Sequence, residues 1–418
     1  MRIKDASTPA VVLNCRRQGG LAMLRTLGRL GVPVWSVDSD RFAPPAFSRF
    51  KAGSFIWDFD AHSPQESLDF LANVGQKIGR KSFLFPTTDA GTLFVSKNAA
   101  ILREHFLFPS QSSNLVEALC SKREMFFLAR QCGIPTPHAT FPLCRADVLD
   151  FGRTSAFPLM VKGIDGKRLE TRAGKRMYIV HSERELLDLY DRSEDPAHPN
   201  LMLQEYIPGG DDSVWMFNGY FNSRSECLFG ITGKKIHQFP IHTGLTSLGV
   251  CIPNEAVVSL TKTFMRAVGY AGILDIGFRY DARDRTYKVL DVNPRVGATF
   301  RLFVSDNGMD VARALYLDLT GQRFEAGAPL GGRKWVVEDL DLVSSARYLW
   351  GRELGFREWL RSYAGVRESA FFALDDPAPF LMMFMHDAKQ LFKQVHGGFE
   401  KSSAPSSYVA DPAEKDAA

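Results

Sequence analysis

The chain has 418 residues, which is the length of two or three ordinary domains. Hydrophobic residues make up 45% of it and charged residues 23%, a composition that excludes a chain that is disordered throughout, collagen-like or a coiled coil. The formal net charge is only +4, so no strongly basic surface is required and we expect no nucleic acid as a partner.

The six cysteines are scattered and form no C-x-x-C pair, which favours free thiols in a reducing compartment over a disulfide framework or a zinc site. The residues before Cys15 lack the long apolar core of a signal peptide. No run of apolar residues approaches the ~18 that a membrane-spanning helix needs. We therefore expect a soluble, cytoplasmic protein.

The N-terminal part of the chain alternates short apolar runs with helical patterns. The predicted elements, in chain order, are a strand over 9–14, a helix over 19–31, a strand over 32–38, a helix over 63–79, a strand over 83–89 and a helix over 91–104. Strands that alternate with helices in this way predict a parallel sheet.

The turn over 14–20 lacks the G-x-G-x-x-G fingerprint of a dinucleotide site, although Asp38 stands where an acidic residue would hold a ribose. Two interpretations of this turn remain open. Its two glycines permit a tight connection and do nothing more, or the helix N-terminus together with Arg16 and Arg17 attracts a carboxylate or phosphate of a substrate.

The pattern changes after residue 112. One helix is predicted over 113–132, and a proline-rich hinge follows at 134–137. From there to residue 321 the strands are longer and joined by glycine-rich turns, which predicts antiparallel sheets with helices on one face. We expect four parts, which are an α/β domain over 1–112, an α+β domain over 113–321, a small C-terminal region over 322–400 and a disordered tail over 401–418.

Two acidic residues on one predicted β-hairpin are candidates for a metal site. Strands are predicted over 273–280 and 287–293, and pairing around the turn between them places Asp275 opposite Asp291. Asn293 lies two residues further and points to the same face. Two carboxylates and an amide oxygen, without His or Cys, suit Mg²⁺, or Mn²⁺ in its place. The alternative is that these acids face solvent in ordinary ion pairs.

Basic residues in three places are candidates for phosphate binding. Arg295 follows Asn293 closely and is placed to hold phosphate oxygens beside a metal ion. Lys122 lies on the helix after the first domain. Lys162 ends an apolar strand and precedes a predicted loop over 163–174 that is rich in Gly, Lys and Arg. The alternative for each lysine is a solvated surface position.

The segment 201–212 runs as a strand into a Pro-Gly-Gly turn that ends in Asp211 and Asp212. It offers polar groups and backbone to a flat base, and then carboxylates to ribose hydroxyls. His242, in a His-Thr-Gly sequence, has two interpretations. It touches phosphate or activates a nucleophile, or it is a hydrogen-bonded histidine in a turn.

Together and in this order, these segments resemble the ATP-grasp superfamily of carboxylate–amine ligases. On the segments 230–247 and 334–342, the chain is similar to the carboligase group related to D-aspartate ligase. The resemblance implies a Rossmann-like pre-ATP-grasp domain, then a two-lobed ATP-grasp fold, then the small C-terminal region.

The resemblance also implies roles for the candidate residues. These are Lys122 and Lys162 for the nucleotide phosphates, Gln204, Glu205 and Ile207 for adenine, Asp211 or Asp212 for ribose, Asp275, Asp291 and Asn293 for magnesium, and Arg295 for the transferring phosphoryl group. Lys162 would also lie near adenine, and His242 would border the nucleotide. Two features depart from the family pattern, because Gln204 stands where many members have Glu and both metal carboxylates are Asp where Glu is common.

The function that the resemblance implies is ATP-dependent amide formation. A substrate carboxylate would attack the γ-phosphate of ATP to give an acyl phosphate and ADP, and the amine of an amino acid or amino-bearing metabolite would then displace phosphate. The loop over 163–174 would close over the nucleotide. Two alternatives remain open, namely a non-catalytic ATP-binding or scaffolding protein and a dinucleotide-dependent oxidoreductase.

Residues 379–395 predict an amphipathic helix, with Lys389 and Lys393 opposite its apolar face. The favoured interpretation is that this helix docks on the protein's own body or on a second subunit, which would make a homo-oligomer. Contact with a membrane surface is the less favoured one.

Overall fold

The computed structural model describes residues 1–396, so the predicted disordered tail over 401–418 lies outside the described residues. The N-terminal part forms a parallel five-stranded sheet in the order β3-β2-β1-β4-β5, which confirms the predicted parallel arrangement. Its strands are β1 Ala10–Leu13, β2 Val34–Asp38, β3 Lys51–Ile56, β4 Ser82–Pro86 and β5 Phe106–Leu107, and its helices are α1 Gln18–Gly28, α2 Pro64–Ile78, α3 Asp89–Lys97 and α4 Ala99–Leu102. A 3₁₀ turn, η1 Pro44–Phe47, follows β2.

The predicted single helix over 113–132 is two helices, α5 Ser113–Cys120 and α6 Lys122–Gln131. Ser121 between them has an extended backbone, and its hydroxyl accepts a hydrogen bond from the backbone N–H of Glu124. A serine that caps a new helix stabilises its first turn by about 1 kcal/mol, which explains the break. The break places Lys122 at the start of α6.

A small lobe follows, built on an antiparallel four-stranded sheet in the order β6-β9-β7-β8. Its elements are β6 Ala139–Thr140, α7 Arg145–Thr154, β7 Leu159–Gly163, α8 Gly166–Ala173, β8 Met177–Val180, α9 Glu183–Ser193 and β9 Leu201–Glu205. The expected loop over 163–174 is wrong, because most of it is the helix α8. Asp165 caps this helix by accepting from the N–H groups of Lys167 and Arg168, and Gly174 ends it in the left-handed conformation.

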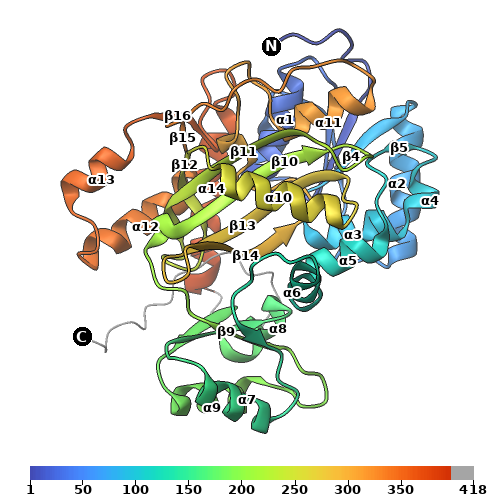
Figure 1. The fold of residues 1–418 in the computed structure, drawn as a ribbon. Coiled ribbons are helices and arrows are strands. Elements are labelled where there is room, and N and C mark those ends of the chain that lie inside the picture. The colour runs from blue at the N-terminus through green and yellow to red at the C-terminus, as the bar shows by residue number, and fades with distance from the viewer. Residues whose placement is uncertain (397–418) are drawn as a thin grey trace.

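The largest sheet has seven strands in the order β14-β13-β10-β11-β12-β15-β16, and all neighbours are antiparallel except β15 and β16. The strands are β10 Val214–Phe221, β11 Cys227–Phe239, β12 Leu245–Cys251, β13 Gly272–Asp281, β14 Thr286–Asn293, β15 Lys334–Val336 and β16 Val366–Ser369. The helices and 3₁₀ turns of this part are η2 Asp211–Ser213, α10 Glu255–Ala267, η3 Phe300–Leu302, α11 Val311–Leu319, α12 Glu338–Trp350, α13 Phe356–Ser362 and α14 Ala378–His396. Figure 1 shows the small lobe on the side of this sheet where β14 forms the edge.

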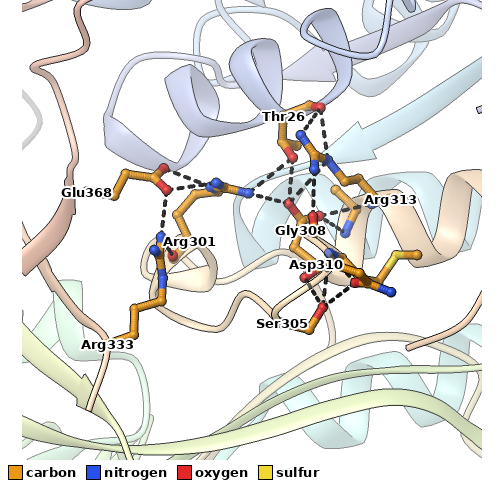
Figure 2. A network of polar contacts seen from close by, with 11 residues as sticks. Thr26, Arg301, Ser305, Gly308, Asp310, Arg313, Arg333 and Glu368 are labelled. Carbon is orange, nitrogen blue, oxygen red and sulfur yellow. Dashed lines mark hydrogen bonds and ion pairs between the residues drawn. The ribbon is translucent and has the colours of Figure 1, made fainter. Parts of the chain in front are cut away.

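A buried polar network joins three distant parts of the chain (Figure 2). Arg301, in η3, donates to Asp310 at 2.6 Å and to both oxygens of Glu368 in β16 at 2.8 and 2.7 Å. The hydroxyl of Thr26 in α1 donates to Asp310 at 2.5 Å, and Arg333 donates to Glu368 at 2.6 Å. Although burial raises the pKa of Glu368, the two guanidinium groups lower it to about 2. The network therefore fixes the N-terminal helix α1 and the C-terminal strand β16 against the loop between them.

The helix α14 packs against η1 of the N-terminal part. Met383 is buried and the ammonium of Lys389 lies 5.3 Å from the ring centre of Phe42, so the helix docks on the protein's own body. Leu381 and Met385 are 63% and 64% exposed, so part of the predicted apolar face does not take part in this docking. Within residues 1–396, no helix is long and apolar enough to cross a membrane.

Candidate active site

The predicted metal-site residues lie on the hairpin of β13 and β14. The structure pairs Asp275 with Asn293 and Gly277 with Asp291, so the expectation that Asp275 lies directly opposite Asp291 is wrong. A register shift beside Phe278 accounts for part of the difference. Positions two apart on one strand share a face, so Asp275, Asp291 and Asn293 still project to the same side of the sheet.

A tight loop covers Asp275. A Cβ atom at Gly297 would lie only 2.4 Å from Oδ2 of Asp275, so this position tolerates no side chain without a shift. Burial raises the pKa of Asp275 to about 6, and the nearby charge of Asp291 adds to this while that of Arg295 opposes it. A carboxyl group with a raised pKa is stabilised as the anion when a cation binds beside it.

The donor set fits a hard cation. The amide nitrogen of Asn293 donates to Asp291 at 3.1 Å, and its amide oxygen accepts from Arg295 at 3.0 Å. The negatively charged oxygens that could bind a cation are therefore those of Asp275 and Asp291. Within the described part of the chain, no three His, Cys, Asp or Glu side chains gather as a metal site. Mg²⁺ in proteins is held by one or two carboxylates together with substrate phosphates and water, and these two carboxylates and one amide match that pattern.

Arg295 lies beside the candidate metal-site residues. Its guanidinium donates to Asp89 at 2.6 Å, to Asn293 and to the carbonyl of Val296 at 3.2 Å. Burial lowers the pKa of Arg295, but Asp89 and the two candidate metal carboxylates outweigh burial and raise it. The side chain is a fixed positive charge with 17% of its surface exposed.

The two candidate phosphate lysines converge on the small lobe. Lys162 in β7 donates to Gln204 in β9 at 3.0 Å, and Lys122 at the start of α6 donates to the carbonyl of Ile164 at 3.2 Å. Burial and, to a lesser degree, the charge of Lys122 lower the pKa of Lys162 to about 8, although Asp291 opposes both. The charge of Asp291 on the candidate hairpin therefore reaches Lys162, and helix α6, which begins at Lys122, contacts β14 of that hairpin.

The candidate adenine segment is buried at Gln204 and Ile207, which are 4% and 2% exposed. The carboxylate of Glu205 accepts from the backbone N–H of His138 at 2.9 Å, from Arg283 at 2.6 Å and from Lys288 at 3.0 Å. Burial raises the pKa of Glu205, but these three donors outweigh burial and leave the pKa below its usual range. The Glu205 side chain thus links the small lobe to the β13–β14 hairpin. It is engaged by Arg283 and Lys288 and not by the candidate phosphate lysines, Lys122 and Lys162.

The two candidate ribose acids differ in their surroundings. Asp211 accepts a hydrogen bond from the hydroxyl of Tyr348, and its Oδ1 lies 3.5 Å from Nδ1 of His242. Asp212 is exposed. The hydrogen bond with Asp211 raises the pKa of His242, burial lowers it, and Glu353 at 2.9 Å also raises it. His242 therefore lies between two carboxylates, those of Asp211 and Glu353.

A search against protein-family models matches none of them. The chain is 24% identical over 289 residues to D-aspartate ligase of Enterococcus faecium (strain Aus0004), covering 66% of this chain and 68% of that protein. Among solved structures, an L-amino acid ligase from Bacillus licheniformis matches with a TM-score of 0.58 and 15% identity over 78% of this chain and 76% of that one. The biotin carboxylase domain of 2-oxoglutarate carboxylase from Hydrogenobacter thermophilus, solved with MgADP and bicarbonate, matches with a TM-score of 0.58 and 14% identity over 78% and 72%. The chain has an ATP-grasp fold.

Three charged residues near the candidate site received no role from the sequence. Lys235 in β11 donates to the carbonyl of Gly244 at 2.7 Å, and burial lowers its pKa to about 8 while Asp275 opposes this. Arg279 in β13 donates to the carbonyl of Ile207 at 2.8 Å. The alternation of the strand places Arg279 on the face of Asp275, which is a signal that the sequence does contain. The third, Asp89, carries no such signal, because its partner Arg295 lies 206 positions away.

Proposed function

We propose that the chain is an ATP-dependent ligase that joins a carboxylate to an amine through an acyl phosphate. The observation that carries this proposal is the convergence of two kinds of group at one place. Asp275 and Asp291 project to the same side of the sheet, their charges act on Arg295, and the charges of Asp291 and Lys122 act on Lys162. Anionic donors for Mg²⁺ next to cationic donors for phosphate suit phosphoryl transfer, in which charge moves between oxygens and little covalent chemistry falls to the protein.

In the proposed reaction, a carboxylate oxygen of the substrate attacks the γ-phosphorus and ADP leaves. The nitrogen of the amine then attacks the acyl carbon, phosphate leaves, and the nitrogen gives up a proton. Lys122 and Lys162 would hold the phosphates, and Arg295 would stabilise the transferring group. Magnesium bound by Asp275, Asp291 and Asn293 would supply neutralisation of the charge on the phosphate oxygens.

No protein nucleophile is needed in this scheme. Cys120 is the cysteine whose pKa responds to Asp89, Arg295 and Asp291. Burial raises the pKa of its thiol to about 12, so the group is a neutral thiol at physiological pH and not an attacking thiolate.

We assign adenine to the buried segment of Gln204 and Ile207, with Glu205 holding that segment in place through its contacts with the hairpin. Because Asp211 is engaged by Tyr348 and His242, we favour Asp212 as the ribose acid and give His242 the role of holding Asp211. Mn²⁺ is an expected substitute for Mg²⁺, since both accept carboxylate oxygens.

The substrate class that we propose is an amino acid, as the carboxylate or the amine. It rests on the D-aspartate ligase and the L-amino acid ligase that the chain resembles. We place this activity in the cytoplasm, where ATP and free amino acids occur together.

The test is phosphate release by the purified chain with ATP, Mg²⁺ and pooled amino acids and amino-bearing metabolites, followed by mass spectrometry of the product. We expect release that depends on a carboxylate and an amine together, and a product mass equal to their sum less one water. ATP binding with no turnover in any pool would favour a non-catalytic ATP-binding protein. Oxidation or reduction of a substrate with a nicotinamide cofactor would contradict the proposal.

A further inference from the structure

The partners of Arg295 are unequal. Nε donates to Oδ1 of Asp89 at 2.6 Å, whereas the contacts with Asn293 and the Val296 carbonyl are 3.0 and 3.2 Å long and involve neutral groups. Asp89 is therefore the only acid among the side chains that hydrogen-bond to this guanidinium within the described residues. It begins helix α3, which follows β4 of the N-terminal sheet, whereas Asn293 ends β14 and Arg295 and Val296 come directly after that strand.

Two more acids lie close to the same guanidinium. Asn293 accepts from Arg295 at 3.0 Å and donates to Asp291 at 3.1 Å, and Asp275 is paired with Asn293 across the hairpin. These are the two carboxylates assigned to Mg²⁺. An arginine that paired with either of them would neutralise a metal ligand, because an ion pair and a metal ion compete for the same oxygen lone pairs.

We propose that Asp89 is a positioning residue that holds Arg295 away from Asp275 and Asp291 and so leaves both carboxylates available to Mg²⁺. The inference rests on the proposed function, since it concerns the metal–nucleotide site. Asp89 gives the guanidinium a charged partner on the side of the N-terminal sheet. Without that partner, Asp291 and Asp275 remain as acids beside the contact between Arg295 and Asn293.

The local structure does not require Asp89 for another purpose. Its helix α3 is capped by Thr88, whose hydroxyl accepts from the N–H of Gly91 at 3.1 Å. Half of the Asp89 side chain is exposed, so the residue fills no core position. A carboxylate in the first turn favours a helix by only about 0.3–1 kcal/mol, and Glu66 holds the comparable first-turn position in α2.

The experiment measures metal binding and not turnover. The melting temperature of the full chain is recorded with saturating β,γ-imido-ATP while Mg²⁺ is titrated, for wild type, Asp89→Asn, Asp89→Glu and the control Glu66→Gln. We expect Asp89→Asn to raise the Mg²⁺ midpoint roughly three- to tenfold, the effect of one partly buried charge contact. Asp89→Glu should have a Mg²⁺ midpoint close to that of the wild type, because glutamate still carries a carboxylate. Glu66→Gln should leave the Mg²⁺ midpoint unchanged.

A double-mutant cycle separates this role from a direct effect of the Asp89 charge on the ion. If Asp89 acts through Arg295, then Asp89→Asn adds no further rise in the Mg²⁺ midpoint in an Arg295→Gln background. The same rise in both backgrounds would overturn the proposal, and so would an unchanged midpoint in Asp89→Asn, with or without a lower melting temperature of the free protein. A wild-type protein that does not respond to Mg²⁺ and the nucleotide would instead overturn the proposed function.

Discussion

Lys162 is the residue at which the structure predicts opposite changes in stability and in binding. Its ammonium is half-buried, its one hydrogen bond in the structure goes to a neutral amide, that of Gln204, and burial together with the charge of Lys122 lowers its pKa from 10.5 to about 8. A lysine in this state destabilises the free protein. We predict that Lys162→Met stabilises the free protein and weakens ATP binding, because methionine keeps the apolar stem and deletes the charge.

The magnitudes follow from the same pKa. At about 1.4 kcal/mol for each pKa unit, a pKa of about 8 in place of 10.5 corresponds to at most ~3–4 kcal/mol of destabilisation. Relaxation around the group reduces this figure, so we expect the variant to gain about 1–2 kcal/mol at pH 7. One charge-assisted contact with a phosphate contributes about 1.5–3 kcal/mol, so ATP should bind roughly 10- to 100-fold more weakly.

The pH dependence has a definite sign. Between pH 8 and 10.5 the unfolded chain carries the proton on Lys162 and the folded chain does not, so the stability of the wild type rises with pH across this window. The advantage of Lys162→Met should therefore be complete below pH 8 and disappear by about pH 10.5. Urea unfolding midpoints at pH 7, 8.5 and 10, with ATP affinities from calorimetry, test this against the exposed control Lys77→Met. A variant that is less stable than wild type at pH 7, or one that binds ATP equally well, would refute the reasoning.

The remaining predictions concern the metal-site hairpin and its covering loop. Asp291→Asn should lower turnover at least ~100-fold and leave most of the ATP affinity, because the metal stabilises the transition state more than the bound nucleotide; the turn variant Asp284→Asn serves as its control, and equal rates would contradict the metal assignment. Gly297→Ala should lower activity about tenfold or more, since its methyl would lie 2.4 Å from Asp275 Oδ2, whereas Gly331→Ala, with no atom within 4 Å of the added methyl, should be neutral in the same assay.

The parts of the fold that the sequence predicts are those that depend on local patterns. Alternating apolar residues place β13 and β14 with their turn between them, and they give Asp275 and Asn293 a common face. The same reasoning yields the N-terminal parallel sheet from runs of strand, helix and strand. These patterns succeed because each depends on neighbours within a few positions, where periodicity directly reflects which side is buried.

The mispredictions come from interactions that periodicity does not record. The helix α8 was expected to be a loop because its sequence is rich in glycine and charge, yet capping by Asp165 stabilises it. The register of the hairpin depends on a local irregularity beside Phe278 that is not apparent in a strict alternation. The contact of Asp89 with Arg295 spans 206 positions, and nothing in either local sequence identifies the partner.

The C-terminal region is bound to the candidate site by contacts of this long-range kind. Its strand β15 pairs with β12 and places Trp335, 1% exposed, in the core beneath the seven-stranded sheet. In α12, the hydroxyl of Tyr348 donates to Asp211, and Asp341 accepts a hydrogen bond from Ser247 at 2.8 Å. Because Asp211 stands four positions after Ile207, the end of the segment assigned to adenine, α12 holds the turn beside the proposed nucleotide site. A region that supplies a core tryptophan and a buried partner to that turn is part of the scaffold of the site, so its sequence is constrained by packing as well as by any partner it binds.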